Sequence, residues 1–196
     1  MKKALAFIFA LVLTMTIISV VAEEPVEKEP TGSQFEQISL KKGTLLSTQY
    51  SSVNYIFGKS YDGYKYEDDH NKIYVQTAVV KDIESGYKYY ALRFIHDYYR
   101  GGSSQTGISV LDSDEIDGVL TTIKYVKEHY KEFVPYTDVA YTANSGVKVG
   151  AFVGATNSYY YIELNSYDTV YFEMNDAYSL FQFFTTAQTA LKATMN

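Results

Sequence analysis

Short segments in which apolar and polar residues alternate follow one another along most of the chain after Phe35. Alternation with a period of two is typical of β-strands that bury one face. Turn residues such as Glu84-Ser85-Gly86 separate these segments, so we expect antiparallel strands joined by hairpins. The predicted strands are residues 38–48, 53–58, 72–83, 87–99 and 107–111 in a first group, and residues 137–143, 147–153, 158–164 and 169–174 in a second.

Two other segments repeat apolar residues every three or four positions, which is typical of amphipathic helices. We expect Asp112 to cap the first helix and Glu115 to complete a capping box, and Asn175 or Asp176 to cap the second. The apolar stripe of the first helix is Ile116, Val119, Leu120, Ile123 and Val126, and that of the second is Ala177, Leu180, Phe181, Phe184, Ala187 and Leu191.

Strands followed by one helix therefore occur twice along the chain. This order predicts an α+β fold with two fused repeats of an antiparallel multi-stranded sheet followed by one covering helix. The first strand–helix unit covers residues 36–133 and the second covers residues 134–196, and we expect them to pack as one globular domain. Each helix is expected to cover one face of its own sheet.

The alternation assigns the residues of the second sheet to two opposite faces. The face expected beneath the C-terminal helix consists of Val147, Val149, Ala151, Val153, Tyr160, Ile162, Leu164, Val170, Phe172 and Met174. The opposite face combines aromatic rings with carboxylates, in Phe152, Tyr159, Tyr161, Glu163, Tyr171 and Glu173. Such a face either packs against the other unit or binds a partner. The chain holds 21 Tyr but no Trp, the residue that glycan-binding surfaces usually prefer, and β-sheets favour tyrosine on structural grounds as well.

The N-terminus has the pattern of an export signal. Lys2 and Lys3 precede an apolar stretch that ends in the small residue Ala22, so residues 1–22 are a predicted signal peptide, and residues 23–35 a flexible acidic linker. Cleavage leaves 15 Lys and Arg against 23 Asp and Glu, a net charge of −8. We expect a periplasmic or extracellular protein with no stable membrane anchor after cleavage. An uncleaved leader that serves as an anchor is the alternative.

Composition and spacing exclude several kinds of chemistry. The chain has no Cys, so it contains no disulfide, thiol nucleophile or cysteine-ligated metal. The acidic segment at residues 59–72 matches no calcium motif, and Asp112, Asp114 and Asp117 match an EF-hand only at its start. We therefore predict no metal site, no cofactor and no catalytic residue. His96 is expected to be a hydrogen-bonded histidine in the core or at its rim, and Arg93 to pair with a carboxylate across the sheet.

Residues 107–127 (GISVLDSDEIDGVLTTIKYVK), together with the plan of four antiparallel strands and a helix, resemble the PC4 and Whirly fold. That family binds single-stranded DNA through basic and aromatic residues on its sheet. Here Glu163, Glu173 and the net negative charge argue against nucleic-acid binding, which requires phosphate neutralisation. The chain also resembles small exported bacterial proteins of unassigned function in residues 81–94, 111–118 and 141–152, a resemblance that implies no catalytic residue.

These observations predict an exported binding or interaction module that is not an enzyme. Its partner would be an envelope or extracellular protein or a glycan, bound through Tyr159, Tyr161, Tyr171, Phe152, Glu163 and Glu173. One alternative is a metal- or carboxylate-dependent hydrolase that uses Asp68, Asp69 and His70, or Glu163 and Glu173. Another is a structural homodimer in the cell envelope that is closed by the same tyrosine-rich face.

Overall fold

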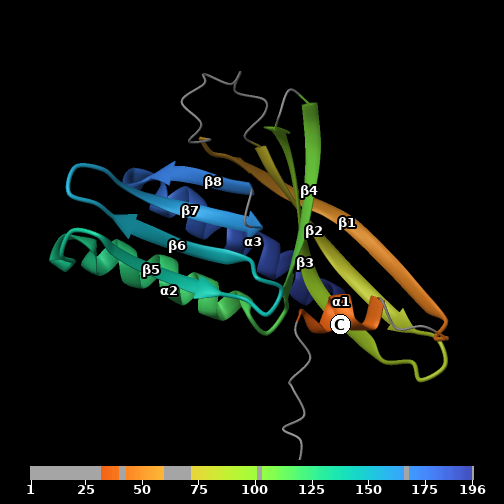
Figure 1. The fold of residues 1–196 in the computed structure, drawn as a ribbon. Helices are drawn as coiled ribbons and strands as arrows, with labels where there is room; N and C mark the ends of the chain where they lie inside the picture. Colours follow the sequence, from red (N-terminus) through yellow and green to blue (C-terminus); the bar gives the residue numbers. More distant parts are fainter. Residues whose placement is uncertain (1–31, 40–42, 60–71, 101–102, 166–167, 196) are drawn as a thin grey trace, which may run out of the picture.

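A computed structural model describes residues 32–39, 43–59, 72–100, 103–165 and 168–195. The predicted signal peptide, the first part of the predicted linker and most of the acidic segment at 59–72 lie outside these residues. The elements, shown in Figure 1, are α1 (Gln34–Ser39), β1 (Leu46–Phe57), β2 (Lys72–Asp82), β3 (Lys88–Arg100), β4 (Ser103–Asp112), α2 (Ile116–His129), the 3₁₀ turn η2 (Tyr130–Glu132), β5 (Thr137–Thr142), β6 (Lys148–Val153), β7 (Ser158–Asn165), β8 (Asp168–Glu173), the 3₁₀ turn η3 (Met174–Asp176) and α3 (Ala177–Met195).

The strands form two four-stranded antiparallel sheets, so the fold is α+β as predicted. Sheet A has the order β1-β2-β3-β4 and sheet B the order β5-β6-β7-β8. The prediction of two strands at residues 38–48 and 53–58 is wrong, because β1 is one strand that continues through a bulge between Ser52 and Asn54. The polar run before Val53 belongs to an exposed edge strand, which needs few apolar residues. Residues 34–39, at the end of the predicted linker, form the short helix α1.

The helices exchange sheets, which corrects the prediction that each covers its own. Helix α2 packs against β5 and β6 of sheet B, whereas α3 packs against β1, β2 and β3 of sheet A and against α2. The predicted inner face of sheet B is buried as expected, with Met174 only partly so; α2 packs on β5 and β6, and α3 side chains share the same core. Tyr160, for example, is fully buried in that face and donates a hydrogen bond to the carbonyl of Ile123 in α2 at 3.4 Å.

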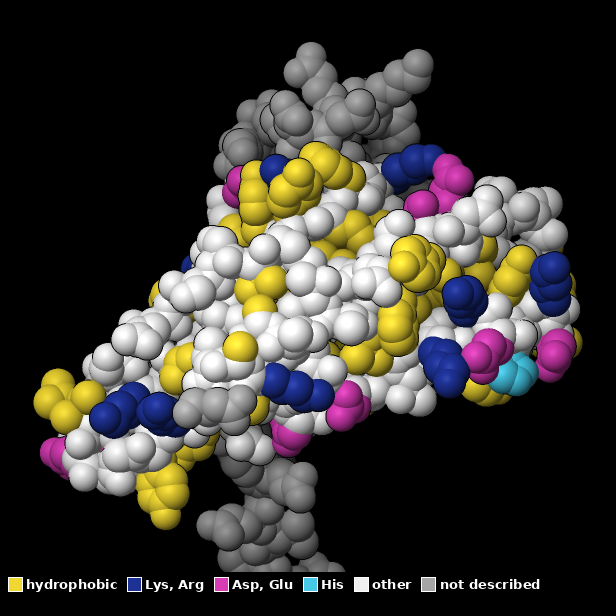
Figure 2. Space-filling view, turned by 180° about the vertical axis from the view of Figure 1, so that it is seen from behind, with side chains coloured by type: hydrophobic (Ala, Val, Ile, Leu, Met, Phe, Trp, Pro, Cys, Tyr) yellow, Lys and Arg dark blue, Asp and Glu magenta, His cyan; other side chains and the backbone are white. Residues whose placement is uncertain are grey.

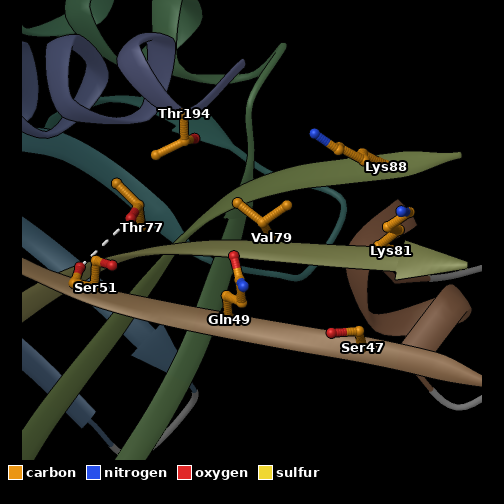
Figure 3. Close-up of a pocket in the computed structure, with 8 residues that line it drawn as sticks. All are labelled: Ser47, Gln49, Ser51, Thr77, Val79, Lys81, Lys88 and Thr194. Carbon is orange, nitrogen blue, oxygen red and sulfur yellow. Dashed lines mark hydrogen bonds between the residues drawn. The ribbon is translucent and has the colours of Figure 1, made fainter. Parts of the chain in front are cut away.

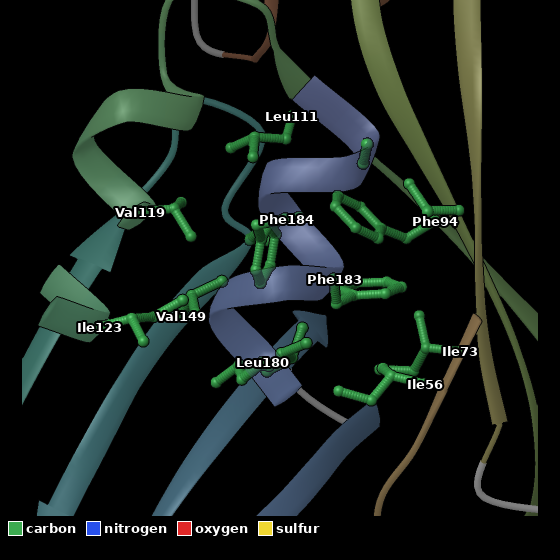
Figure 4. Close-up of a cluster of buried hydrophobic side chains, with 14 of the residues drawn as sticks. Ile56, Ile73, Phe94, Leu111, Val119, Ile123, Val149, Leu180, Phe183 and Phe184 are labelled. Atoms are coloured by element: carbon green, nitrogen blue, oxygen red, sulfur yellow. The ribbon is translucent and has the colours of Figure 1, made fainter. Parts of the chain in front are cut away.

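The core is built around α3, which lies between apolar side chains of both units (Figure 4). Phe183 and Phe184 are both buried, and their ring centroids lie 6.3 and 5.8 Å from that of Phe94 in sheet A. Phe183 was not assigned to the apolar stripe of this helix, whereas Phe181, which was, is only partly buried. The stripe predicted for α2 is confirmed, with Leu120 partly buried and the other four side chains fully buried.

A pair of buried carboxylates joins α1, α2 and the β5–β6 turn. The Asp112 carboxylate accepts hydrogen bonds from the amides of Gln34 at 2.6 Å and Phe35 at 3.2 Å, so it caps α1 and not α2 as predicted. The second hydrogen bond of the predicted capping box does form: the Glu115 carboxylate accepts from the Asp112 amide at 3.0 Å. Glu115 also accepts a hydrogen bond from the Asn144 amide at 2.7 Å. Burial raises the pKa of both carboxyls, and the amide donors partly oppose that shift.

A second buried contact joins the two sheets. His96 Nδ1 lies 2.5 Å from Asp168 Oδ1, and each side chain is at least 98% buried. Ser109 in β4 donates a hydrogen bond to the carbonyl of Leu164 in β7 at 2.6 Å. The prediction of a hydrogen-bonded core histidine is thus confirmed. Arg93 contacts no carboxylate among the described residues.

The described partners of Arg93 are the Gln76 amide oxygen at 2.7 Å and the ring of Tyr50, whose centroid lies 4.8 Å from the guanidinium carbon. The predicted cross-sheet ion pair is therefore replaced by an amide hydrogen bond and a cation–π contact.

We expect Asp112→Ala to lower the free energy of unfolding by about 1–2 kcal/mol, because it leaves the first amides of α1 without an acceptor. Urea unfolding measures the change, and hydrogen exchange at Gln34 and Phe35 should become faster. Asp114→Ala is the matched control, since Asp114 is exposed and makes no such bond to α1. Equal effects of the two substitutions would show that Asp112 does not hold α1 in place.

Candidate functional site

All six residues of the predicted binding surface lie on the outer face of sheet B. The strand register places Tyr159 between Phe152 and Glu173, and Tyr161 between Gly150 and Tyr171. Glu163 lies opposite Lys148 on the next strand. Because α2 packs on the other side of this sheet, the outer face is not the seam between the two units. We call the set Phe152, Tyr159, Tyr161, Glu163, Tyr171 and Glu173 the tyrosine face.

Aromatic rings form a continuous row across the tyrosine face. The ring centroids of Phe152 and Tyr159 are 5.5 Å apart, and those of Tyr159 and Tyr171 are 4.9 Å apart with the planes at 86°. Tyr136 extends the row at 6.5 Å from Phe152. Edge-to-face and tilted contacts of this kind are the favoured geometries for aromatic pairs.

Tyr136 is a residue of this row that the sequence analysis missed. Its side chain is 75% exposed, and its backbone has φ 70°, in the left-handed region that non-glycine residues rarely adopt. The amide of Tyr136 donates a hydrogen bond to the Val153 carbonyl at 2.6 Å, which fixes this conformation at the start of β5. Pro135, which lies between two elements, was the available signal, since proline often marks a turn.

The tyrosines of the face differ in exposure. Tyr161 is only 7% exposed, and its hydroxyl donates to Asp138 Oδ1 at 2.9 Å. Burial, together with this bond, raises the pKa of Tyr161 far above its usual value, so the hydroxyl stays protonated. Tyr159 and Tyr171 are partly exposed. Tyr161 therefore supports the surface from below, and the accessible ring area belongs to its neighbours.

Each carboxylate of the tyrosine face has a partner. Glu163 accepts a hydrogen bond from Lys148 Nζ at 2.9 Å, and Glu173 forms an ion pair with Lys59. That pairing lowers the pKa of Glu173 and raises that of Lys59. With Asp138 bonded to Tyr161, the face carries nearly balanced charge and many hydrogen-bonding groups.

The segment after β1 reaches sheet B and fixes one edge of the tyrosine face. Lys59 and Tyr171 exchange two backbone hydrogen bonds, of 2.7 Å and 2.8 Å, and form an isolated antiparallel bridge. Gly58 allows this approach, because a Cβ atom there would lie 2.1 Å from Val170 Cγ1 and 2.9 Å from the Tyr171 carbonyl oxygen. The chain of the first unit therefore helps to position the site on the second.

The floor of the face is a shallow depression of about 190 Å³, lined by Asp138, Lys148, Phe152, Tyr159, Tyr161, Glu163, Thr169 and Tyr171. Chemically this arrangement offers ring surfaces, hydroxyls and paired charges. Within the described residues, no three His, Asp or Glu side chains are grouped so that they could hold a metal ion. The hydrolase candidates Asp68, Asp69 and His70 lie outside the described residues.

A second aromatic cluster, on the outer face of sheet A, was also missed. Tyr55, Phe57 and Tyr74 are exposed, and Lys72 Nζ lies 3.7 Å from the ring centroid of Tyr55 and 4.6 Å from that of Tyr74. Tyr55 and Phe57 are two positions apart in β1, and Lys72 and Tyr74 are two positions apart in β2. The pairing of the two strands therefore places all four side chains on one face of the sheet. This alternation was the signal that the sequence offered.

Figure 2 shows the opposite side of the molecule from the tyrosine face, where charged side chains lie mainly toward the ends and a broad uncharged zone lies between them. No helix in the described part of the chain has both the length and the apolar character required to cross a membrane.

We expect Gly58→Ala to destabilise the protein by about 1–3 kcal/mol, because the added methyl group forces β8 and the Lys59 segment apart. Hydrogen exchange should accelerate at the Tyr171 amide, which bonds to Lys59, more than at the amide of Leu92 within sheet A. Unchanged exchange at Tyr171 would show that the bridge does not hold the edge of the tyrosine face.

Comparisons of the chain with protein-family models, with curated proteins and with solved structures found no match. The resemblance to the PC4 and Whirly fold therefore stays a prediction, and function has to be inferred from the geometry of the tyrosine face alone.

Proposed function

We propose that this protein is an exported, non-enzymatic binding module and that the tyrosine face is its binding surface. The single observation that carries the proposal is the continuous row of four rings, from Tyr136 through Phe152 and Tyr159 to Tyr171, on a sheet face that α2 and α3 do not cover. Contiguous apolar area that is rimmed by polar groups is typical of interaction sites. The export pattern of residues 1–22 supports a location in the periplasm or outside the cell.

The charge balance of the face favours a neutral, hydroxyl-rich ligand. Glu163 is paired with Lys148, Glu173 with Lys59, and Asp138 with the Tyr161 hydroxyl, so no carboxylate is left for a cationic partner. These groups retain acceptor and donor capacity that suits sugar hydroxyls, and exposed ring faces suit the apolar faces of sugar rings. A neutral glycan fits this surface better than a charged polypeptide does.

The same geometry does not favour the hydrolase alternative. A carboxyl that acts as a general acid needs a raised pKa, whereas the pairing with Lys59 lowers that of Glu173. Glu163 is likewise held by Lys148 and lies in a shallow depression instead of a deep pocket.

We expect the double variant Tyr159→Ser/Tyr171→Ser to lose glycan binding by a factor of about 10 or more, since each stacked ring contributes about 1 kcal/mol. Affinity electrophoresis in gels that contain laminarin, xylan or hydroxyethylcellulose measures the retardation of each variant. Tyr87→Ser is the matched control, because Tyr87 is 70% exposed in the β2–β3 hairpin, away from sheet B. It should migrate like the wild type in every gel.

Urea unfolding separates loss of binding from loss of structure, and Tyr159→Phe/Tyr171→Phe, which keeps both rings, should retain most of the binding. A wild type that none of the three polysaccharides retards would contradict the glycan proposal. Sedimentation velocity tests the homodimer, because a dimer that the serine variant converts to monomer would assign the tyrosine face to self-association.

A further inference from the structure

A cavity of about 300 Å³ lies on the face of sheet A that α3 covers, beyond the last turn of α3 (Figure 3). Strands β1, β2 and β3 provide its floor, and the C-terminal end of α3 borders it. Its volume is at the lower limit for small-molecule sites and suits a ligand about as large as one sugar unit. The lining residues are Ser47, Gln49, Ser51, Thr77, Val79, Lys81, Lys88 and Thr194.

Two lysines oppose each other directly at one end of this cavity. Lys81 in β2 and Lys88 in β3 are register partners on either side of the Glu84-Ser85-Gly86 turn. Like charges at opposed positions of a sheet are destabilising, and both of these lysines are exposed to solvent. The cavity lining contains no Asp or Glu, although acids outnumber bases 23 to 17 in the chain. Strand β1 beside it has no charged residue at all.

The uncharged side chains of the lining indicate which hydrogen-bonding groups a ligand would need besides its charge. Thr77 is 97% buried as a residue, and its hydroxyl donates to the Ser51 carbonyl at 3.5 Å; the Thr194 hydroxyl donates to the Leu191 carbonyl at 2.7 Å. Since both hydroxyl protons are engaged, the oxygens are available as acceptors for donors on a ligand. The Gln49 side chain supplies both a donor and an acceptor, and Val79 offers a small apolar contact.

We propose that this cavity binds a hydroxylated organic anion of monosaccharide size, such as a sugar acid or a sugar phosphate. The oxyanion lies between the ammonium groups of Lys81 and Lys88, where it offsets their repulsion. Ligand hydroxyls donate to Thr77 and Thr194 and exchange hydrogen bonds with Gln49. The site belongs to sheet A and shares no residue with the tyrosine face, so it goes beyond the proposed glycan surface and can fail independently of it.

Lys81 is the more informative residue to substitute. Lys88 also borders a neighbouring depression that contains Asp112 and Asp114, so its replacement would disturb the surroundings of α1. Lys81→Gln removes one charge and keeps a polar side chain of similar length, and Lys81→Arg keeps the charge. Lys124→Gln is the matched control, because Lys124 is an exposed lysine on α2, far from this cavity in sequence and on another element.

Isothermal titration calorimetry with D-glucuronate, D-glucose 6-phosphate and D-glucose tests the proposal on the full chain. We expect at least one of the two anions to bind and glucose to bind at least tenfold more weakly, since glucose cannot form charge-assisted hydrogen bonds with the two ammonium groups. Lys81→Gln should weaken anion binding about tenfold, whereas Lys81→Arg and Lys124→Gln should bind like the wild type. The two anions distinguish a carboxylate site from a phosphate site.

Urea unfolding provides the structural readout. Lys81→Gln should be at least as stable as the wild type without ligand, because it relieves the repulsion from Lys88. Absence of binding by both anions, equal binding of glucose, or an unchanged affinity in Lys81→Gln would each overturn the proposal. A loss of stability in Lys81→Gln would also overturn it, since the lysine pair would then have a structural role.

Discussion

The packing of two adjacent phenylalanines in α3 joins the apolar faces of the two units. Consecutive residues of an α-helix point about 100° apart, so Phe183 and Phe184 bury area on two different sides of the same helix. Phe183 lies on the side of Ile56 and Ile73 in sheet A, whereas Phe184 lies toward Val119 and Val149 of α2 and sheet B and also contacts the ring of Phe94 in sheet A (Figure 4). A helix that is apolar on two sides cannot bury both of them by packing against a single sheet. This constraint accounts for the exchange of helices and for a main core that both units share. A smaller apolar cluster, which includes Phe35 of α1, is separate from that core.

The junctions at the edges of the core depend on buried polar groups. The carboxylates of Asp112 and Glu115 accept hydrogen bonds from backbone amides of α1, of β4 and of the turn that follows β5. The side chains of His96 and Asp168 contact each other between the sheets. Buried carboxylates are costly unless they are hydrogen-bonded, which makes these contacts sensitive to the loss of either partner. They fix where the two sheets lie relative to each other without adding much to the burial of apolar area.

Within the described residues, α2 and α3 lie on the other side of sheet B and leave its outer face uncovered by either helix. The packing below it provides rigidity, since Tyr161 is buried and anchored to Asp138 while Tyr159 and Tyr171 present partly exposed rings. The bridge between Lys59 and Tyr171 ties the edge of this face to the first unit. The proposed function therefore depends on both units, although every ring of the row comes from the second.

Local pattern alone determined the strands other than β1, the positions of α2 and α3, and the two faces of sheet B, because the period of two in a pleat and the repeat of 3.6 residues in a helix are properties of neighbouring residues. The same alternation identified Phe152, Tyr159 and Tyr171 as one surface. It did not reveal that Asp112 caps α1, that Arg93 meets Gln76 and Tyr50, or that Tyr136 joins the row of rings, since the first two partners are distant in sequence and the last depends on an unusual backbone angle. The tertiary structure alone decided which sheet each helix covers. A hydrophobic stripe specifies that a helix must be buried but carries no information about which of two similar apolar faces buries it.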